Sequence, residues 1–260
     1  MVTGTALGAV IATSLGLVPL VGPPRLSVDG FTAVSGDLRA AAQESLLTAA
    51  SATALAAAIG LAIATLVVRA GHGVRLMIGL AVGVVTVPHL VGAAATGLLL
   101  SDVGLAQRWS GVAASSWPEL VGGRWPFATV LELAWKESAF VALVVVVSVG
   151  RRYEDLREVA SALGAAPRQQ WRRVLLPLSG PALASASLIA FVYALGTFEV
   201  ARLLGRAYPE PLPVMSYRLF TSIDITARPQ AAATAVVVTA LALFVAVMAL
   251  PLVRRLGADR

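Results

Sequence analysis

The chain has 260 residues, of which 58 % are apolar and only 13 % are charged. Adding the 23 glycines brings the apolar share to about 67 %, against about 45–50 % on the same scale for soluble domains. A single globule of this length still leaves about a quarter of its unfolded surface in water, so the composition excludes a soluble enzyme. Disordered and fibrous proteins fit equally badly, and the composition predicts an integral membrane protein.

The basic residues are spread along the chain. Nineteen of the 20 are Arg, and no basic run with interleaved aromatic residues occurs, so the net charge of +6 does not indicate a nucleic-acid partner. In a membrane protein such cations flank the spans and face the lipid bilayer. The absence of Cys excludes disulfides, thiolate catalysis and zinc–sulfur sites, and because the chain has only two His, we expect no metal site.

Six stretches are apolar over about 20 residues, the length that crosses the hydrocarbon core as a helix. Their apolarity is continuous rather than alternating, which indicates an all-α membrane protein. The first stretch is either a secretory signal peptide or a retained helix, and the absence of a basic start favours the helix. Both chain ends then lie on one side, and 11 arginines against 8 favour the cytoplasm as that side. The stretches are residues 4–21, 41–68, 76–100, 127–149, 181–204 and 231–253.

Three charged side chains, Glu132, Lys136 and Glu137, fall inside the fourth stretch. Charges at membrane depth are costly and usually face the interior of a helix bundle. Glu132 and Lys136 are four residues apart, so they either neutralise each other on the helix or line a translocation path with Glu137. The sequence leaves both interpretations open.

The fifth stretch contributes Thr197, Glu199 and Arg202 as further candidates for the translocation path. The alternative is a pair on the helix surface, in which Glu199 is neutralised by Arg202 or Arg206.

Pro88 and His89 interrupt the third stretch. A proline kink is the expected consequence, and a ligand role for His89 is the alternative.

Residues 150–180, between the fourth and fifth stretches, are more regular than a linker requires. Residues 153–163 predict a helix that Gly164 is suited to end. The apolar side chains of this helix share one face at helical spacing, namely Leu156, Val159, Ala160 and Leu163. The alternative is a solvated basic loop that only fixes the orientation of the chain.

Pro167 presets the first turn of a second helix, and we expect Pro177 and Pro181 to end it before the fifth stretch. The sequence therefore predicts a helix–turn–helix between two membrane spans.

The same segment resembles a cytoplasmic motif found in the membrane subunits of bacterial ABC importers, written E-A-A-x3-G-x9-I-x-L-P. The spacing is kept, since Gly164 lies six positions after Glu158 and nine residues separate it from Val174. The chain departs from the motif where Val159 and Val174 replace Ala and Ile. The positions in register are Glu158, Ala160, Gly164, Val174, Leu176 and Pro177.

By this resemblance the chain is identified as a type I ABC importer permease. The implied fold has about six transmembrane helices and a cytoplasmic coupling helix–turn–helix between spans four and five. The implied parts are a first transmembrane helix with an outer loop (1–37), the permease domain (38–255) and a cytoplasmic tail (256–260). The residues that would contact the ATPase are Glu158, Ala160, Leu163, Gly164, Ala165, Pro167, Val174, Leu176 and Pro177.

The resemblance implies a multi-pass protein of the bacterial inner membrane that forms part of a solute pathway and couples uptake to ATP hydrolysis. Segments 135–140 and 195–205 look like the branch that carries polyamines, iron, sulfate or thiamine. The chain contains no G-x4-G-K-[ST] phosphate loop, so we expect a non-catalytic subunit without a cofactor, with ATP and Mg²⁺ on the partner.

The implied partners are two ATPase subunits, a second permease subunit or a second copy of this chain, and an extracytoplasmic solute-binding protein. The outer segments 101–124 and 207–228 would meet that binding protein. The alternative function is an ion-gradient-driven secondary transporter that uses carboxylates such as Glu132, Glu137 or Glu199.

Overall fold

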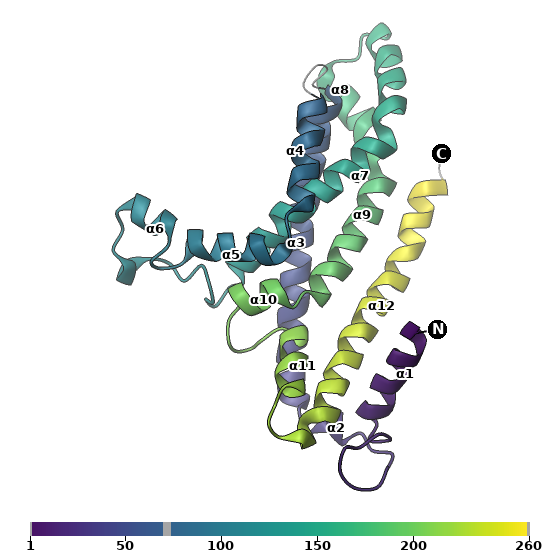
Figure 1. The fold of residues 1–260 in the computed structure, drawn as a ribbon. Coiled ribbons are helices and arrows are strands. Elements are labelled where there is room, and N and C mark those ends of the chain that lie inside the picture. Colours follow the sequence, from purple (N-terminus) through teal and green to yellow (C-terminus); the bar gives the residue numbers. More distant parts are fainter. Residues whose placement is uncertain (1, 70–73, 259–260) are drawn as a thin grey trace. The chain divides into compact units, whose positions relative to one another are not determined.

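The computed structural model describes residues 2–69 and 74–258, and within them the regular structure is helical with no strand (Figure 1). The first half of the chain contains α1 (Val2–Ser14), α2 (Asp29–Thr32), α3 (Ser35–Arg69), α4 (Val74–Thr86), α5 (His89–Leu100), α6 (Leu105–Ser110) and the short 3-10 helix η2 (Ala114–Ser116). The second half contains α7 (Phe127–Ala162), α8 (Pro167–Gln170), the π-helical turn η3 (Trp171–Leu175), α9 (Leu176–Gly196), α10 (Glu199–Leu204), α11 (Leu212–Phe220), the 3-10 helix η4 (Ile225–Ala227) and α12 (Arg228–Ala258).

Four helical stretches among the described residues are long and apolar enough to cross a membrane. They are Ser35–Arg69, His89–Ser110, Pro167–Gly196 and Ile225–Leu256. Two apolar helices, Gly4–Ser14 and Arg75–Thr86, are shorter, and the predicted fourth span lies within the 36-residue helix α7. The prediction of an all-α membrane protein is confirmed.

The predicted third span is broken rather than kinked. Helix α4 ends at Thr86 and α5 begins at His89, with Val87 and Pro88 between them. Pro88 has no N–H to continue the backbone hydrogen bonds of the helix, and its ring disfavours helical geometry at Val87. The expected kink is therefore wrong, and the chain is left with two helix ends inside an apolar stretch.

The predicted separate helix at 153–163 is also wrong, because α7 continues through it without interruption. The only helix-breaking residue on the way is Gly150, and one glycine costs a helix only about 1 kcal/mol. Just beyond it, Tyr153 is 1 % exposed and packs in a core cluster with Leu175, which offsets that cost.

Pro177 and Pro181 do not end the second helix as predicted. Residues 167–196 run as one helical stretch, and Pro181 lies inside α9. The π-helical turn η3 directly precedes Pro177, and its wider backbone ring accommodates a residue that cannot donate the usual bond.

The described chain divides into two compact units, and α3, α5, α7, α9 and α12 contribute residues to both. Unit 1 comprises Met1–Ala49, Ala93–Thr129 and Leu195–Val245, and unit 2 comprises Ala50–Gly92, Val130–Ala194 and Ala246–Arg260. Each unit has its own apolar core.

The core of unit 1 joins the start of α3 to α11 and the start of α12. Its buried side chains are Val34, Ala41, Leu212, Met215, Leu219, Ala227 and Ala231. Two polar contacts hold the loop before α11 against α3. The Ser45 hydroxyl accepts the N–H of Leu212 at 2.8 Å, and Arg206 forms an ion pair with the buried Glu44.

The same loop makes a third contact at the surface of unit 1. The phenol of Tyr208 donates to a carboxylate oxygen of Asp37 at 3.1 Å, and this hydrogen bond raises the pKa of Tyr208 above its usual value.

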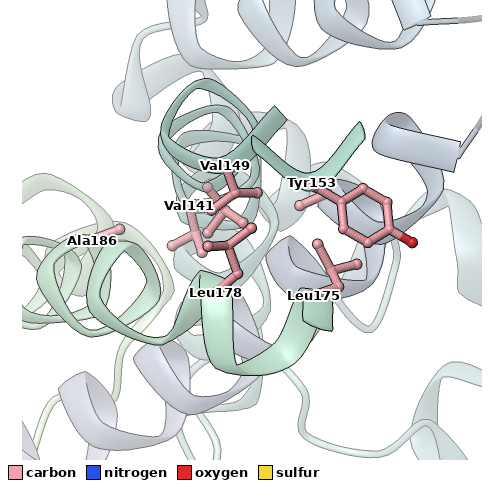
Figure 2. Packing of buried hydrophobic residues seen from close by; sticks show 8 residues of the cluster. Val141, Val149, Tyr153, Leu175, Leu178 and Ala186 are labelled. Carbon is pink, nitrogen blue, oxygen red and sulfur yellow. The ribbon is translucent and has the colours of Figure 1, made fainter. Parts of the chain in front are cut away.

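The core of unit 2 is built mainly from α7 and α9 (Figure 2). Tyr153 lies beside Leu175, and Val141 and Val149 lie close to Leu178. Helix α3 approaches α7 closely at Gly60, where an added Cβ would lie 2.7 Å from Val141. A larger residue at position 60 would force these helices apart.

Glu44→Gln should destabilise the protein, because it removes the charge opposite Arg206 while keeping the side-chain volume. The side chains of Glu44 and Arg206 are 3 % and 21 % exposed, so breaking the pair should lower the unfolding free energy by about 3 kcal/mol. Thermal unfolding in detergent measures the loss. The control is the same substitution in an Arg206→Gln background. If Glu44→Gln lowers the unfolding free energy there by as much as in the wild type, the two side chains are not coupled and this expectation is wrong.

Candidate functional site

The turn at the end of α7 is a Schellman motif built on Gly164. Gly164 has φ +75°, its N–H donates to the carbonyl of Ser161 at 2.9 Å, and the N–H of Ala165 donates to that of Ala160 at 2.9 Å. This left-handed conformation is the one that glycine adopts without cost. The predicted helix stop at Gly164 is therefore present, and it fixes the direction in which the chain leaves α7.

Helix α8 begins at Pro167, as predicted, and two glutamines hold it to the turn. Ala166 is extended, as a residue before proline prefers, and its N–H donates to the side-chain oxygen of Gln169 at 2.9 Å. The side-chain amide of Gln170 donates to the Ser161 hydroxyl at 3.1 Å and to the Ala165 carbonyl at 2.9 Å. The turn is thus braced by side chains from both of the helices that it joins.

The apolar face at the end of α7 is not covered within unit 2. Leu156, Val159 and Leu163 are 41 %, 58 % and 82 % exposed. They border a cavity of about 580 Å³, the α7 groove, whose other lining residues are Ala160, Arg173, Val174, Pro177, Leu178 and Leu256. An open apolar groove of this size is a surface suited to side chains of a partner.

Four of the nine predicted coupling residues, Ala160, Leu163, Val174 and Pro177, line the α7 groove. The other five do not line it. Glu158 is exposed on α7, Gly164 and Ala165 form the turn, and Leu176 is exposed at the start of α9. Pro167, the first residue of α8, lines a separate cavity with Thr65, Arg69, Arg168 and Trp171.

A charged cluster occupies the break between α4 and α5 in unit 2. His89 Nδ1 lies 3.3 Å from Glu132 Oε1, and His89 Nε2 lies 3.5 Å from Glu137 Oε1. The ring of His89 also packs on Tyr193 of α9, with centroids 4.7 Å apart. The imidazole thus bridges two carboxylates that successive turns of α7 carry.

Lys136 acts on the backbone rather than on a neighbouring carboxylate. Its ammonium donates to the carbonyl of Val87, which the break before Pro88 leaves without a helical partner. The predicted neutralisation of Lys136 by Glu132 is wrong, because within the described residues Glu132 pairs with His89 and forms no ion pair with Lys136. A cation at a helix C-terminus is electrostatically favourable, which fits this placement.

A cavity of about 380 Å³ opens beside this cluster, lined by His89, Lys136, Glu137, Phe140 and Tyr193 among others. Of the predicted pathway residues, Lys136 and Glu137 therefore face an open space. Glu132 is 1 % exposed and lies behind His89.

Thr197, Glu199 and Arg202 belong to unit 1. Thr197 is buried in the break between α9 and α10, whereas Glu199 and Arg202 are exposed on α10. The interpretation in which Arg206 neutralises Glu199 is wrong, since Arg206 pairs with Glu44, and none of the ion pairs in the described part of the chain involves Glu199.

The contacts of His89 with two carboxylates were not predicted from the sequence. Its contacts to Glu132 and Glu137 span more than 40 residues along the chain, so spacing within one helix gave no sign of them. The available signal was a titratable residue directly after a proline inside an apolar stretch.

Lys136→Met should destabilise the protein, because methionine has nearly the length of lysine but cannot donate to the Val87 carbonyl. We expect a loss of about 1–3 kcal/mol, the cost of leaving a buried acceptor unsatisfied. Chemical unfolding in detergent measures it, and Lys136→Gln, which keeps a donor, is the matched control. Equal stability of Lys136→Met and the wild type would show that the hydrogen bond from Lys136 to the Val87 carbonyl does not contribute to stability.

Comparison with known proteins places this geometry in a family. Residues 75–257 match the family described as "Binding-protein-dependent transport system inner membrane component". Two curated relatives from Escherichia coli (strain K12) are similar in part. The chain is 39 % identical to the inner membrane ABC transporter permease protein YdcU over 66 residues, which are 25 % of this chain and 21 % of that protein. It is 30 % identical to YnjC, described in the same words, over 142 residues, which are 54 % of this chain and 26 % of that protein.

The matched segments thus span only about a fifth and a quarter of these relatives.

The fold is similar to that of a solved structure, with a TM-score of 0.78. That structure is the crystal structure of a bacterial alginate ABC transporter in complex with its pentasaccharide-bound periplasmic protein. The match covers 97 % of this chain and 88 % of that chain at 17 % identity. This likeness shows the fold, which is that of a type I ABC importer permease. The protein is a multi-pass inner-membrane protein. Since the family match covers most of its length, the chain belongs to the binding-protein-dependent transport system inner membrane components.

Proposed function

We propose that this chain is the permease subunit of an ATP-binding-cassette importer and couples ATP hydrolysis by partner subunits to the uptake of a small solute. The observation that carries the proposal is the α7 groove, an uncovered apolar surface that the motif residues Ala160, Val174 and Pro177 line in part. Family membership supports the same function.

The α7 groove is the proposed docking site of the ATPase. A helix end with an apolar stripe suits a helix-in-groove contact, and the exposed carboxylate of Glu158 can add a charge-assisted hydrogen bond that sets the register. Force applied at the turn enters α7 directly, because this helix has no break between the turn and the membrane segment. The Schellman turn and the two glutamines keep the end of the helix from yielding.

The proposed assembly contains two ATPase subunits, which hold ATP and Mg²⁺, and a second permease subunit or a second copy of this chain. An extracytoplasmic solute-binding protein would dock on segments 101–124 and 207–228. The similar alginate transporter was solved with a periplasmic protein, which supports such a partner here. In this arrangement the α7 groove and both chain ends face the cytoplasm.

The proposed solute path includes Lys136 and Glu137, which line the cavity at the break of α4 and α5. Thr197, Glu199 and Arg202 are proposed path residues of unit 1. Polyamine, iron, sulfate and thiamine-like solutes remain the proposed classes.

One observation favours the alternative, a secondary transporter driven by an ion gradient. A broken helix flanked by buried ionisable groups is a common ion site in such transporters, and His89, Glu132 and Glu137 form such a group. The two functions differ in their energy source.

Uptake into proteoliposomes that contain the assembled complex should require ATP on the side of the ATPase. Accumulation of solute should stop when ATP is omitted and should persist when a protonophore dissipates the proton gradient. Scintillation counting of radiolabelled solute measures both conditions. Uptake that continues without ATP and collapses with the protonophore would establish the secondary transporter instead.

Leu163→Asp should detach the ATPase, because it places a charge on the most exposed apolar side chain of the α7 groove. We expect at least about tenfold weaker binding, since burying an unpaired carboxylate costs more than about 1.4 kcal/mol.

Gly164→Val should also impair coupling, because valine is strained at φ +75°.

Co-purification of the ATPase and solute-stimulated ATP hydrolysis measure both effects. The control is Glu154→Ala, which changes an exposed α7 residue outside the groove. Unchanged ATPase retention in both groove variants, with normal insertion, would mean that the partner docks elsewhere.

A further inference from the structure

Unit 1 contains an apolar cavity of about 550 Å³ whose lining residues are not among the proposed path residues. It lies between α1, α11 and α12, and in Figure 1 α1 runs beside the first half of α12. Its polar lining groups are largely satisfied within the chain, since Thr13 donates to the Ala9 carbonyl and Ser216 donates to the Ala231 carbonyl. Cavities of this volume commonly hold small molecules.

Arg228 is the only charged residue among those that line this cavity. Its guanidinium carbon lies 4.2 Å from the ring centroid of Phe220, so a cation–π contact holds it at the wall. Its Nε is buried and has no hydrogen-bond partner, and none of the ion pairs within the described residues involves Arg228.

Three arginines line a second cavity in unit 1, and two of them are paired within the chain, whereas the third, Arg202, is exposed to solvent. Arg206 pairs with Glu44, and Arg218 pairs with Glu210 at 2.6 Å. The acidic residue nearest to Arg228 in the sequence, Asp224, instead accepts the N–H and hydroxyl of Thr226. Arg228 is half-buried, with a buried Nε that has no partner, and a cation held against an apolar wall without a counter-charge is costly. An anion that the chain does not supply would therefore stabilise this site.

The position of Arg228 in the chain indicates where that anion comes from. Arg228 is the first residue of α12 and lies three residues into the membrane-crossing stretch Ile225–Leu256. A residue near the end of a membrane span lies close to the level of the lipid headgroups. Beyond it the cavity follows small side chains into the apolar layer, with Ala231, Ala232 and Ala235 on α12 and Ala9 and Val10 on α1.

From these observations we propose that the cavity between α1, α11 and α12 is a binding site for one anionic phospholipid. The phosphate would pair with the guanidinium of Arg228, whose planar fork matches two phosphate oxygens. An acyl chain would lie along the alanines and displace water from the apolar wall. Because no acidic residue lines the cavity, nothing in it would receive the ammonium of a zwitterionic headgroup. The proposal does not rest on the proposed transport function, although α11 and Arg228 also belong to the segment 207–228 that is proposed to meet the binding protein.

The test uses the full chain in lipid nanodiscs made either of phosphatidylcholine alone or with added phosphatidylglycerol. Phosphatidylglycerol should raise the melting temperature of the wild type and remain as one bound lipid in native mass spectrometry. Arg228→Gln should weaken retention of that lipid by about tenfold or more, because a charge-assisted hydrogen bond is lost. Arg228→Lys keeps the charge but lacks the planar guanidinium, so its retention of the lipid should lie between that of the wild type and that of Arg228→Gln.

Three comparisons distinguish a lipid at this cavity from a general surface charge effect and from a free phosphate ion. Arg25→Gln removes an exposed arginine of the same unit and should leave lipid retention unchanged. Ala232→Leu should weaken retention by filling the acyl slot while leaving Arg228 in place. Inorganic phosphate should not displace the lipid.

The decisive readout is the increase in melting temperature caused by phosphatidylglycerol. Arg228→Gln should abolish this increase whatever it does to the baseline stability. The proposal is overturned if the increase persists in Arg228→Gln, if phosphatidylcholine alone gives the same increase, or if inorganic phosphate competes equally. It is also overturned if a second copy of the chain occupies the cavity and excludes lipid.

Discussion

The constraint that shapes this protein is the cost of leaving a backbone carbonyl or a charge unpaired where water is absent. The break at Pro88 creates such a carbonyl on Val87, and the ammonium of Lys136 satisfies it. In the same break, the imidazole of His89 is held between the carboxylates of Glu132 and Glu137 on α7. The break is thus compensated in two ways, by a donor to its open carbonyl and by contacts between one imidazole and two carboxylates.

The features that could be predicted from the sequence are those decided by local chemistry. Gly164 ends α7 and Pro167 begins α8, because a left-handed turn and a fixed φ depend on the residue itself. The surrounding motif also indicated the family, because its spacing is fixed. The coupling role of those residues is a proposal that rests on an exposed groove, and no spacing rule measures exposure.

The features that could not be predicted depend on contacts between distant segments. Tyr153 keeps α7 helical past Gly150 by packing with Leu175, a residue of the following π-helical turn. The pairing of His89 with Glu132 required α5 and α7 to meet, and the pairing of Arg206 with Glu44 required a loop to reach α3. For Glu132 and Arg206 helical spacing suggested a nearer partner, Lys136 and Glu199 respectively, whereas in the fold they pair with residues distant in the sequence.

The continuity of α7 has a geometric consequence. Lys136 and Ala162 are separated by about 39 Å along a single helix axis, at about 1.5 Å per residue, with no break in the helix between them. If α7 turns about its axis as a rigid rod at the Gly164 end, the same rotation reaches Lys136, and a small arc there is enough to move the ammonium off the Val87 carbonyl. The unbroken helix therefore offers a direct mechanical route from the turn at Gly164 to the break between α4 and α5.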